Sequence, residues 1–129
     1  MIKGEKVEEK MDFNEYQMRA QKFDTFSYED FLAAGAKVDN LGLLEKILGL
    51  MGESGEVCEK VKKVIRDEKG VVSEEKKKEI VKEMGDVLWY LAMVSKYLGV
   101  KFEEVAKMNL KKLEDRLERN KIHGAGDNR

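Results

Sequence analysis

With 129 residues, the chain has the length of one domain and leaves no room for a second. Hydrophobic residues make up 42% of it and charged residues 40%, and proline is absent, a composition typical of long helices with one solvated face. The net charge is −1 and the basic residues form no dense block, which argues against binding to a nucleic acid polymer. With one cysteine, Cys58, and one histidine, His123, the chain can form neither a disulfide framework nor a cysteine- or histidine-rich metal site.

The N-terminal segment, residues 1–11, is polar and contains glycine, and we expect it to be frayed or to form a crossing contact. Met1–Lys10 is charged and lacks the apolar segment of a signal peptide. No later stretch approaches the roughly 20 consecutive apolar residues that span a bilayer. We therefore expect a soluble, cytoplasmic protein that has no membrane partner.

Two short helices are predicted next. Asp12 is a candidate N-cap for a helix that runs to about Phe23, because apolar residues follow it at helical spacing. Ser27 is a second candidate N-cap, since two acidic residues stand in the turn behind it, where they interact favourably with the helix dipole. Gly35 is expected to end this second helix.

A long helix is predicted to begin at Asp39 or Asn40 and to stop at Gly70. Its apolar stripe, which we expect to face a core, consists of Leu43, Leu44, Ile47, Leu50, Val57, Val61 and Val64. Gly52 and Gly55 flank an acidic pair within this helix. Glycine there would let either a ligand or a neighbouring helix approach the backbone, and the sequence leaves both explanations open.

Ser73 is a candidate N-cap for a third helix that runs to about Leu98 and ends at Gly99. Its apolar stripe consists of Ile80, Met84, Val87, Leu91, Val94 and Leu98. A second stripe borders the first and consists of Glu79, Glu83, Asp86, Tyr90 and Tyr97. A fourth helix is predicted from about Phe102 to Asn120. Its candidates for burial are Val105, Met108, Leu110, Leu113 and Leu117.

The tail, residues 122–129, is turn-like and rich in small residues, and we expect that residues 121–129, like residues 1–11, can be flexible. Four major helical segments joined by short connections predict an all-α fold. We expect a four-helix-type bundle formed by a single domain, residues 1–129.

Two acidic pairs stand within this helical pattern. Glu53 and Glu56 are separated by one helical turn, and Glu83 and Asp86 repeat that spacing after residues 57–82. A single such pair is usually a solvated helix face, but both pairs here adjoin apolar stripes. Four carboxylates brought together between two helices repel one another unless a cation or a proton neutralises them. Oxygen ligands favour Mg²⁺, with Mn²⁺ as a substitute, over zinc or iron.

The chain resembles the MazG-type all-α nucleoside triphosphate pyrophosphohydrolases, in their compact single-domain branch. The family's metal signature is Glu-x-x-Glu, a variable spacer and Glu-x-x-Asp, and the two acidic pairs match it. The resemblance covers nearly the whole chain and includes Tyr16-Gln17, residues 49–57, residues 83–91, Asn109-Leu-Lys-Lys112-Leu and residues 124–129. One departure is Gly52, where some members carry another glutamate, which leaves the number of bound metals open.

The resemblance implies Mg²⁺-dependent hydrolysis of a nucleoside or deoxynucleoside triphosphate to the monophosphate and pyrophosphate. Water would attack the α-phosphorus, and Glu53, Glu56, Glu83 and Asp86 would hold the metal. Glu56 is one candidate for the general base, although the sequence does not choose among the four carboxylates.

Substrate contacts are less sharply defined. Lys60 and Lys63 follow Glu56 along one helix, where they can reach phosphate oxygens, although ordinary surface lysines explain them equally well. By the resemblance, Lys112, Arg116 and Asn109 match the family's substrate-contacting positions.

Several single residues have simpler explanations. We expect Trp89 and Tyr90 to pack the helices rather than stack on a base, His123 to lie on the surface, and Cys58 to fill a core or an interface. The modest core and the resemblance together imply a homodimer or homotetramer.

Two alternative functions remain open. Phosphoribosyl-ATP pyrophosphatase shares the fold and the metal chemistry, and a non-catalytic helical interaction module would keep the fold without turnover.

Overall fold

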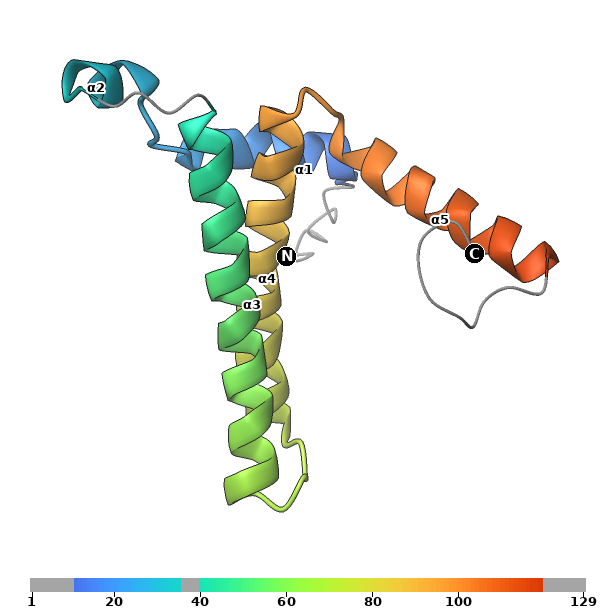
Figure 1. The fold of residues 1–129 in the computed structure, drawn as a ribbon. Coiled ribbons are helices and arrows are strands. Elements are labelled where there is room, and N and C mark those ends of the chain that lie inside the picture. The colour runs from blue at the N-terminus through green and yellow to red at the C-terminus, as the bar shows by residue number, and fades with distance from the viewer. Residues whose placement is uncertain (1–10, 36–39, 120–129) are drawn as a thin grey trace, which may run out of the picture.

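The computed structural model describes residues 11–35 and 40–119, and the ribbon is drawn in Figure 1. Its elements, in chain order, are α1 (Phe13–Ala20), the 3₁₀ helix η1 (Gln21–Phe23), α2 (Tyr28–Ala33), α3 (Leu41–Asp67), α4 (Glu74–Tyr97) and α5 (Phe102–Glu118). No strand occurs among the described residues, so the all-α prediction is confirmed. The predictions made for residues 1–10, Asp39, His123 and the C-terminal tail lie outside the described residues.

No helix in the described ranges is both long and apolar enough to cross a membrane.

The helix starts follow the local chemistry of the sequence. Asp12, Ser27 and Ser73 each accept a hydrogen bond from the backbone N–H three residues later, at 2.8, 3.3 and 3.2 Å. Gly70 and Gly99, with φ of 79° and 70°, lie just beyond the ends of α3 and α4, in the left-handed region that glycine tolerates. These predicted helix boundaries are confirmed.

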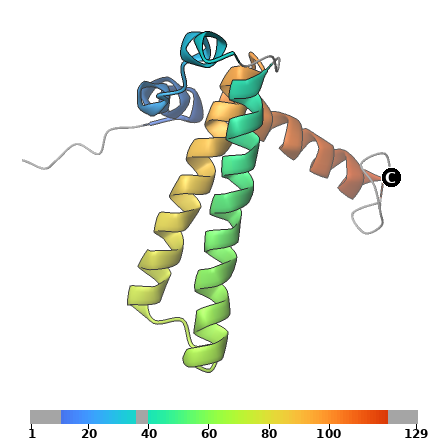
Figure 2. The ribbon, with the colours of Figure 1, turned by 60° about the vertical axis from the view of Figure 1, so that its left-hand side comes forward.

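Helices α3 and α4 form an antiparallel hairpin and lie side by side in both ribbon views (Figures 1 and 2). Two glycines of α3 allow their close approach. A Cβ at Gly42 would lie 2.5 Å from the ring of Tyr97, and one at Gly49 would lie 2.1 Å from the ring of Tyr90. By contrast, Gly52 and Gly55 have nothing within 4 Å of that position. Close helix packing therefore explains two of the glycines but not the two that flank the acidic pair.

Helix α1 lies across the end of the hairpin and contacts both α4 and α5. A small core forms there from Ala20, Ala92, Met93 and Phe102, with Tyr16, Leu88 and Trp89 packed against it. The indole N–H of Trp89 donates a hydrogen bond to the carbonyl of Ala20 at 3.2 Å, which fixes α1 against α4.

Much of the predicted core is exposed in the single chain. Val64 is buried, whereas exposed fractions reach 45% at Leu44, 54% at Met84 and 69% at Leu117. In the isolated chain the prediction of burial is wrong for the exposed members of these stripes, which are Leu44, Ile47, Val61, Met84, Leu91, Leu98, Val105, Met108, Leu110, Leu113 and Leu117. The other members on α3 and α4 are half-buried, apart from the buried Val64. The physical reason is visible in Figure 1, where α5 extends away from the hairpin and leaves the faces of α3 and α4 uncovered.

Candidate metal and substrate site

Three of the predicted metal ligands converge between the two long helices. Glu53 on α3 and Glu83 and Asp86 on α4 each offer a carboxylate oxygen, and these oxygens lie within 4.8 Å of one another. The antiparallel hairpin brings the two i,i+3 pairs to the same level, although residues 57–82 separate them in sequence. Glu53 and Glu83 are half-buried and Asp86 is exposed, so the group is open to a ligand from solvent.

Glu56 lies outside this group of three and is exposed. Its negative charge still acts on Glu53, one helical turn away. The structure therefore places Glu56 at the edge of the acidic cluster, and its role as ligand or general base remains a prediction.

The electrostatics of the cluster favour a cation. Burial raises the pKa of Glu53, and the negative charges of Asp86, Glu83 and Glu56 raise it further, in that order. Three carboxylate oxygens with no nitrogen or sulfur donor fit a hard divalent ion such as Mg²⁺ or Mn²⁺. Such an ion would relieve the mutual repulsion of these side chains.

Tyr16 is a residue whose proximity to the site was not predicted. Burial raises the pKa of its phenol, and the negative charge of Asp86 raises it further. The phenol of Tyr16, on α1, is therefore close enough to the acidic cluster to be affected by its negative charge. Tyr16-Gln17 is one of the motifs that carry the family resemblance, so the sequence did mark this residue. Its closeness to Asp86 could not be predicted, because the two residues lie far apart in the sequence.

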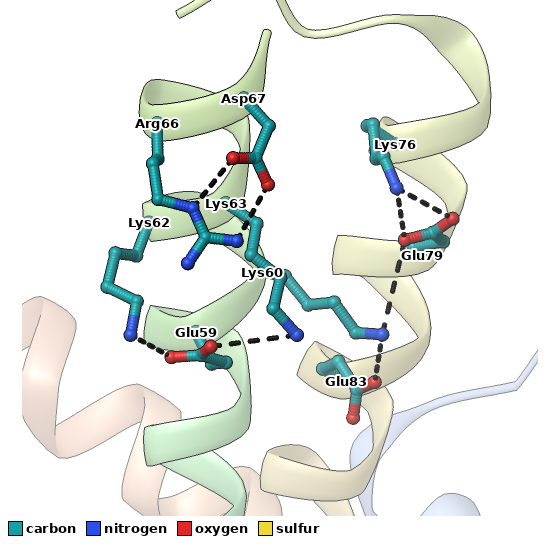
Figure 3. Close-up of polar contacts among 9 residues, drawn as sticks. All are labelled: Glu59, Lys60, Lys62, Lys63, Arg66, Asp67, Lys76, Glu79 and Glu83. Atoms are coloured by element: carbon teal, nitrogen blue, oxygen red, sulfur yellow. Dashed lines mark hydrogen bonds and ion pairs between the residues drawn. The ribbon is translucent and has the colours of Figure 1, made fainter.

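The two lysines that follow Glu56 point in different directions, as Figure 3 shows. The Nζ of Lys60 lies 3.5 Å from Oε1 of Glu83 and 4.0 Å from Oε2 of Glu79. The Nζ of Lys63 instead lies 3.6 Å from Glu59 on its own helix. Lys60 thus borders the acidic cluster, whereas Lys63 is paired along the outer side of α3.

An apolar groove of about 370 Å³ adjoins the cluster. It is lined by Ser54, Val57, Met84, Val87, Leu88 and Leu91. The first four of these each directly follow one of the four acidic residues in the sequence. The hydroxyl of Ser54 donates to the carbonyl of Leu50 at 2.7 Å, so its polar group is satisfied within the helix. The groove therefore offers an apolar surface beside a strongly negative one.

The α5 candidates are not brought to the acidic cluster within one chain. Asn109 is exposed, Lys112 is half-buried and Arg116 is buried, with 4% exposure. Asn109 and Lys112 line a separate pocket of about 490 Å³ where α4 meets α5. Because α5 extends away from the hairpin (Figure 1), the fold of one chain does not bring these residues to the acidic cluster, and their role in substrate binding remains a prediction.

The aromatic residues beside the cluster pack the fold. The rings of Trp89 and Tyr90 meet edge to face at 4.9 Å between centroids, and Tyr90 lies against Gly49. Cys58 is exposed on α3, so it does not fill a core in the single chain, and the alternative, that it fills an interface, stays a prediction.

Comparison with known proteins gives a family match. A model described as the MazG nucleotide pyrophosphohydrolase domain matches residues 43–120, a range that contains both acidic pairs and all of α5. The chain is also similar to the Gene 37 protein of Mycobacterium phage L5, with 44% identity over 88 residues, which is 68% of this chain and 77% of that protein. No solved structure matches the chain.

Proposed function

The chain belongs to the MazG nucleotide pyrophosphohydrolase family, and from this premise we propose that it hydrolyses a nucleoside or deoxynucleoside triphosphate to the monophosphate and pyrophosphate, with Mg²⁺ as its metal. The observation that carries the proposal is the convergence of Glu53, Glu83 and Asp86, with oxygens within 4.8 Å of one another. Neither acidic pair alone would distinguish a metal site from a solvated helix face.

The proposed mechanism assigns a role to each side chain. Glu53, Glu83 and Asp86 would hold Mg²⁺, which when bound neutralises charge on phosphate oxygens and makes water more acidic. Water attacks the α-phosphorus in line with the departing pyrophosphate. Glu56, exposed at the edge of the cluster, accepts the proton of that water. This division of roles fits the finding that Glu56 stands outside the group of three.

The apolar groove beside the cluster is the proposed site for the base or sugar. Its lining is apolar apart from Ser54, so it would bind by contact area and shape rather than by charge. The triphosphate would then lie beside the carboxylates, and the Mg²⁺ that they would hold would neutralise part of its charge.

We also propose that the active form is a homodimer or homotetramer. Large apolar side chains are exposed along α3, α4 and α5, among them Met51 at 70%, Met84 at 54% and Met108 at 68%. Such surface is normally covered in a stable protein. A second copy that covers it can also bring Asn109, Lys112 and Arg116 of its α5 towards the substrate, which one chain alone does not do.

The test is an assay for pyrophosphate release by the purified protein with Mg²⁺. The substrates are the ribo- and deoxynucleoside triphosphates, their oxidised and methylated forms, and phosphoribosyl-ATP. We expect monophosphate and pyrophosphate in equal amounts, and a loss of about two orders of magnitude or more in the Asp86→Ala variant. Release of orthophosphate would contradict the reaction, and no turnover with any of these compounds would favour a non-catalytic module.

A further inference from the structure

Lys60, on α3, is held against the acidic cluster by two carboxylates of the facing helix α4. Its Nζ lies 3.5 Å from Glu83 and 4.0 Å from Glu79, and its side chain is 30% exposed. Glu79 is in turn 3.1 Å from Lys76, which lies 3.8 Å from Glu68 near the tip of the hairpin. Charges of alternating sign therefore run from the hairpin tip to the cluster, and Figure 3 shows the part from Lys76 to Glu83.

This arrangement gives Glu83 a cation partner in the metal-free protein. Glu83 shares its surroundings with the carboxylates of Glu53 and Asp86, and the ammonium of Lys60 offsets part of their repulsion. The Glu83 side chain is 21% exposed, so solvent screens this contact less than it screens a surface pair.

The same contact must oppose a divalent cation. An ion bound by Glu83 would stand within a few ångströms of the Lys60 ammonium, and two positive charges at such a distance repel. We propose that Lys60 is a positioning residue that holds the Glu83 carboxylate in the metal-free protein and competes with the divalent cation for it. This inference rests on the proposed function, because it takes the cluster to be the metal site. In this proposal Lys60 acts on the affinity for the metal and does not contact the phosphates of the substrate.

The test is calorimetric titration of Mg²⁺, and separately Mn²⁺, into the purified nucleotide-free protein. The variant is Lys60→Met, which removes the charge and keeps most of the side-chain length. The matched control is Lys62→Met, which removes one charge from the same helix but from a residue that pairs with Glu59 and is 62% exposed. Lys60→Arg retains the charge and tests for rescue.

We expect the dissociation constant for Mg²⁺ to fall by about 3–10-fold in Lys60→Met and to stay near the unaltered value in Lys62→Met and Lys60→Arg. In metal-free buffer the melting temperature of Lys60→Met should fall below that of Lys62→Met, and saturating Mg²⁺ should close the gap. This second measurement also shows whether each variant is folded.

Other outcomes overturn the inference. Equal or weaker Mg²⁺ binding by folded Lys60→Met, relative to Lys62→Met, shows that Lys60 does not compete with the ion. If the affinity for Mg²⁺ is unchanged and KM for the nucleotide rises, Lys60 contacts phosphate instead. If the unaltered protein binds no Mg²⁺, the metal site in the proposed function fails together with this inference, whereas the first two results leave that site intact.

Discussion

The ammonium of Lys46 lies 2.9 Å from the carboxylate of Asp24, and these side chains are only 4% and 2% exposed. The hydroxyl of Tyr97 donates to the same carboxylate at 2.8 Å. The rings of Phe26, Trp89 and Tyr97 surround the ammonium, with centroids 5.6, 5.7 and 5.8 Å from Nζ. This buried cluster joins the segment before α2 to both long helices.

The first prediction concerns alkaline pH and Tyr97. Burial raises the pKa of Tyr97 to about 12, and its hydrogen bond to Asp24 also raises it. The unfolded chain loses that proton near pH 10, so the contribution of Tyr97 to stability is complete below pH 10 and is lost as the pH approaches about 12. The melting temperature of the unaltered protein should therefore fall more steeply over this range than that of Tyr97→Phe.

The control for this prediction is Tyr90→Phe, which removes a hydroxyl from the same helix and keeps Tyr97. Its melting temperature should decline as in the unaltered protein. Burial lowers the pKa of Lys46, but its hydrogen bonds to Glu45 and Asp24 more than offset this effect, so the pKa of Lys46 is raised as well. Because Lys46 is present in all three proteins, a decline that all three share is not assigned to Tyr97. Parallel profiles for Tyr97→Phe and the unaltered protein would rule out the proposed role of the hydroxyl.

Local signals in the sequence were sufficient for the helix boundaries. A cap such as Ser73 depends on residues within one turn, so its chemistry can be recognised without knowledge of the fold. The i,i+3 spacing of Glu83 and Asp86 is local in the same sense. Both residues come close to Glu53 because the two long helices form a hairpin.

Features that depend on distant segments could not be predicted. Lys46 has the sequence context of a solvated lysine, and its burial requires Asp24 and three aromatic rings from other elements. Glu56 repeats the spacing of Asp86 but stays outside the group of three, because spacing alone does not determine side-chain orientation. The apolar stripes were recognised from their spacing, but spacing does not show which of these residues a single chain covers, and many of them are exposed.

The second prediction is that alanine substitution has opposite effects on stability at two glycines of α3. Gly49→Ala should lower the free energy of unfolding by about 1–3 kcal/mol, because a Cβ there would lie 2.1 Å from the ring of Tyr90 and the helices must shift. Gly55→Ala should raise it by about 0.5–1 kcal/mol, since nothing lies within 4 Å and alanine favours the helix. Urea denaturation measures both changes.

Activity measurements on Gly55→Ala then test whether the active protein needs free space at the backbone of Gly55. Loss of activity in a more stable variant indicates that a ligand or a partner helix approaches the backbone at Gly55. Unchanged activity would show that neither approach takes place.

The third prediction concerns Gln17, which caps α5 from another helix. Its side-chain N–H₂ donates to the carbonyls of Ala92 and Val100 at 3.2 and 3.0 Å, and its oxygen accepts from the N–H of Phe102 at 3.0 Å. Lys101, at the N-cap position, supplies no side-chain hydrogen bond of its own. Gln17→Ala should therefore lower the free energy of unfolding by about 1–3 kcal/mol, because partly buried backbone groups lose their partner.

A suitable control is Gln21→Ala, which makes the same substitution at an exposed position of η1. We expect it to change stability by less than about 0.5 kcal/mol. Hydrogen exchange adds a local measurement, since faster exchange at Phe102 in Gln17→Ala alone would locate the lost cap. Equal stability of the two variants would show that α5 does not depend on Gln17.

The fourth prediction uses the raised pKa of Glu53. Burial and the neighbouring carboxylates make the ionised form unfavourable in the folded state, so the contribution of Glu53 to stability is favourable below about pH 4.5 and is lost as the pH rises through its raised pKa. In chelator at pH 7, Glu53→Gln should therefore melt about 1–3 °C higher than the unaltered protein. This difference should disappear near pH 4.

Saturating Mg²⁺ should reverse the order of the two proteins. An ion present at 100 times its dissociation constant stabilises the unaltered protein by about 2.7 kcal/mol, and Glu53→Gln loses most of this gain together with its activity. Glu114→Gln, an exposed substitution on α5, should change neither melting temperature. Because repulsion in the metal-free state and ligation in the loaded state have opposite effects, only a residue that takes part in both gives this reversal. Equal stabilisation of Glu53→Gln and the unaltered protein by Mg²⁺ would therefore remove Glu53 from the metal site.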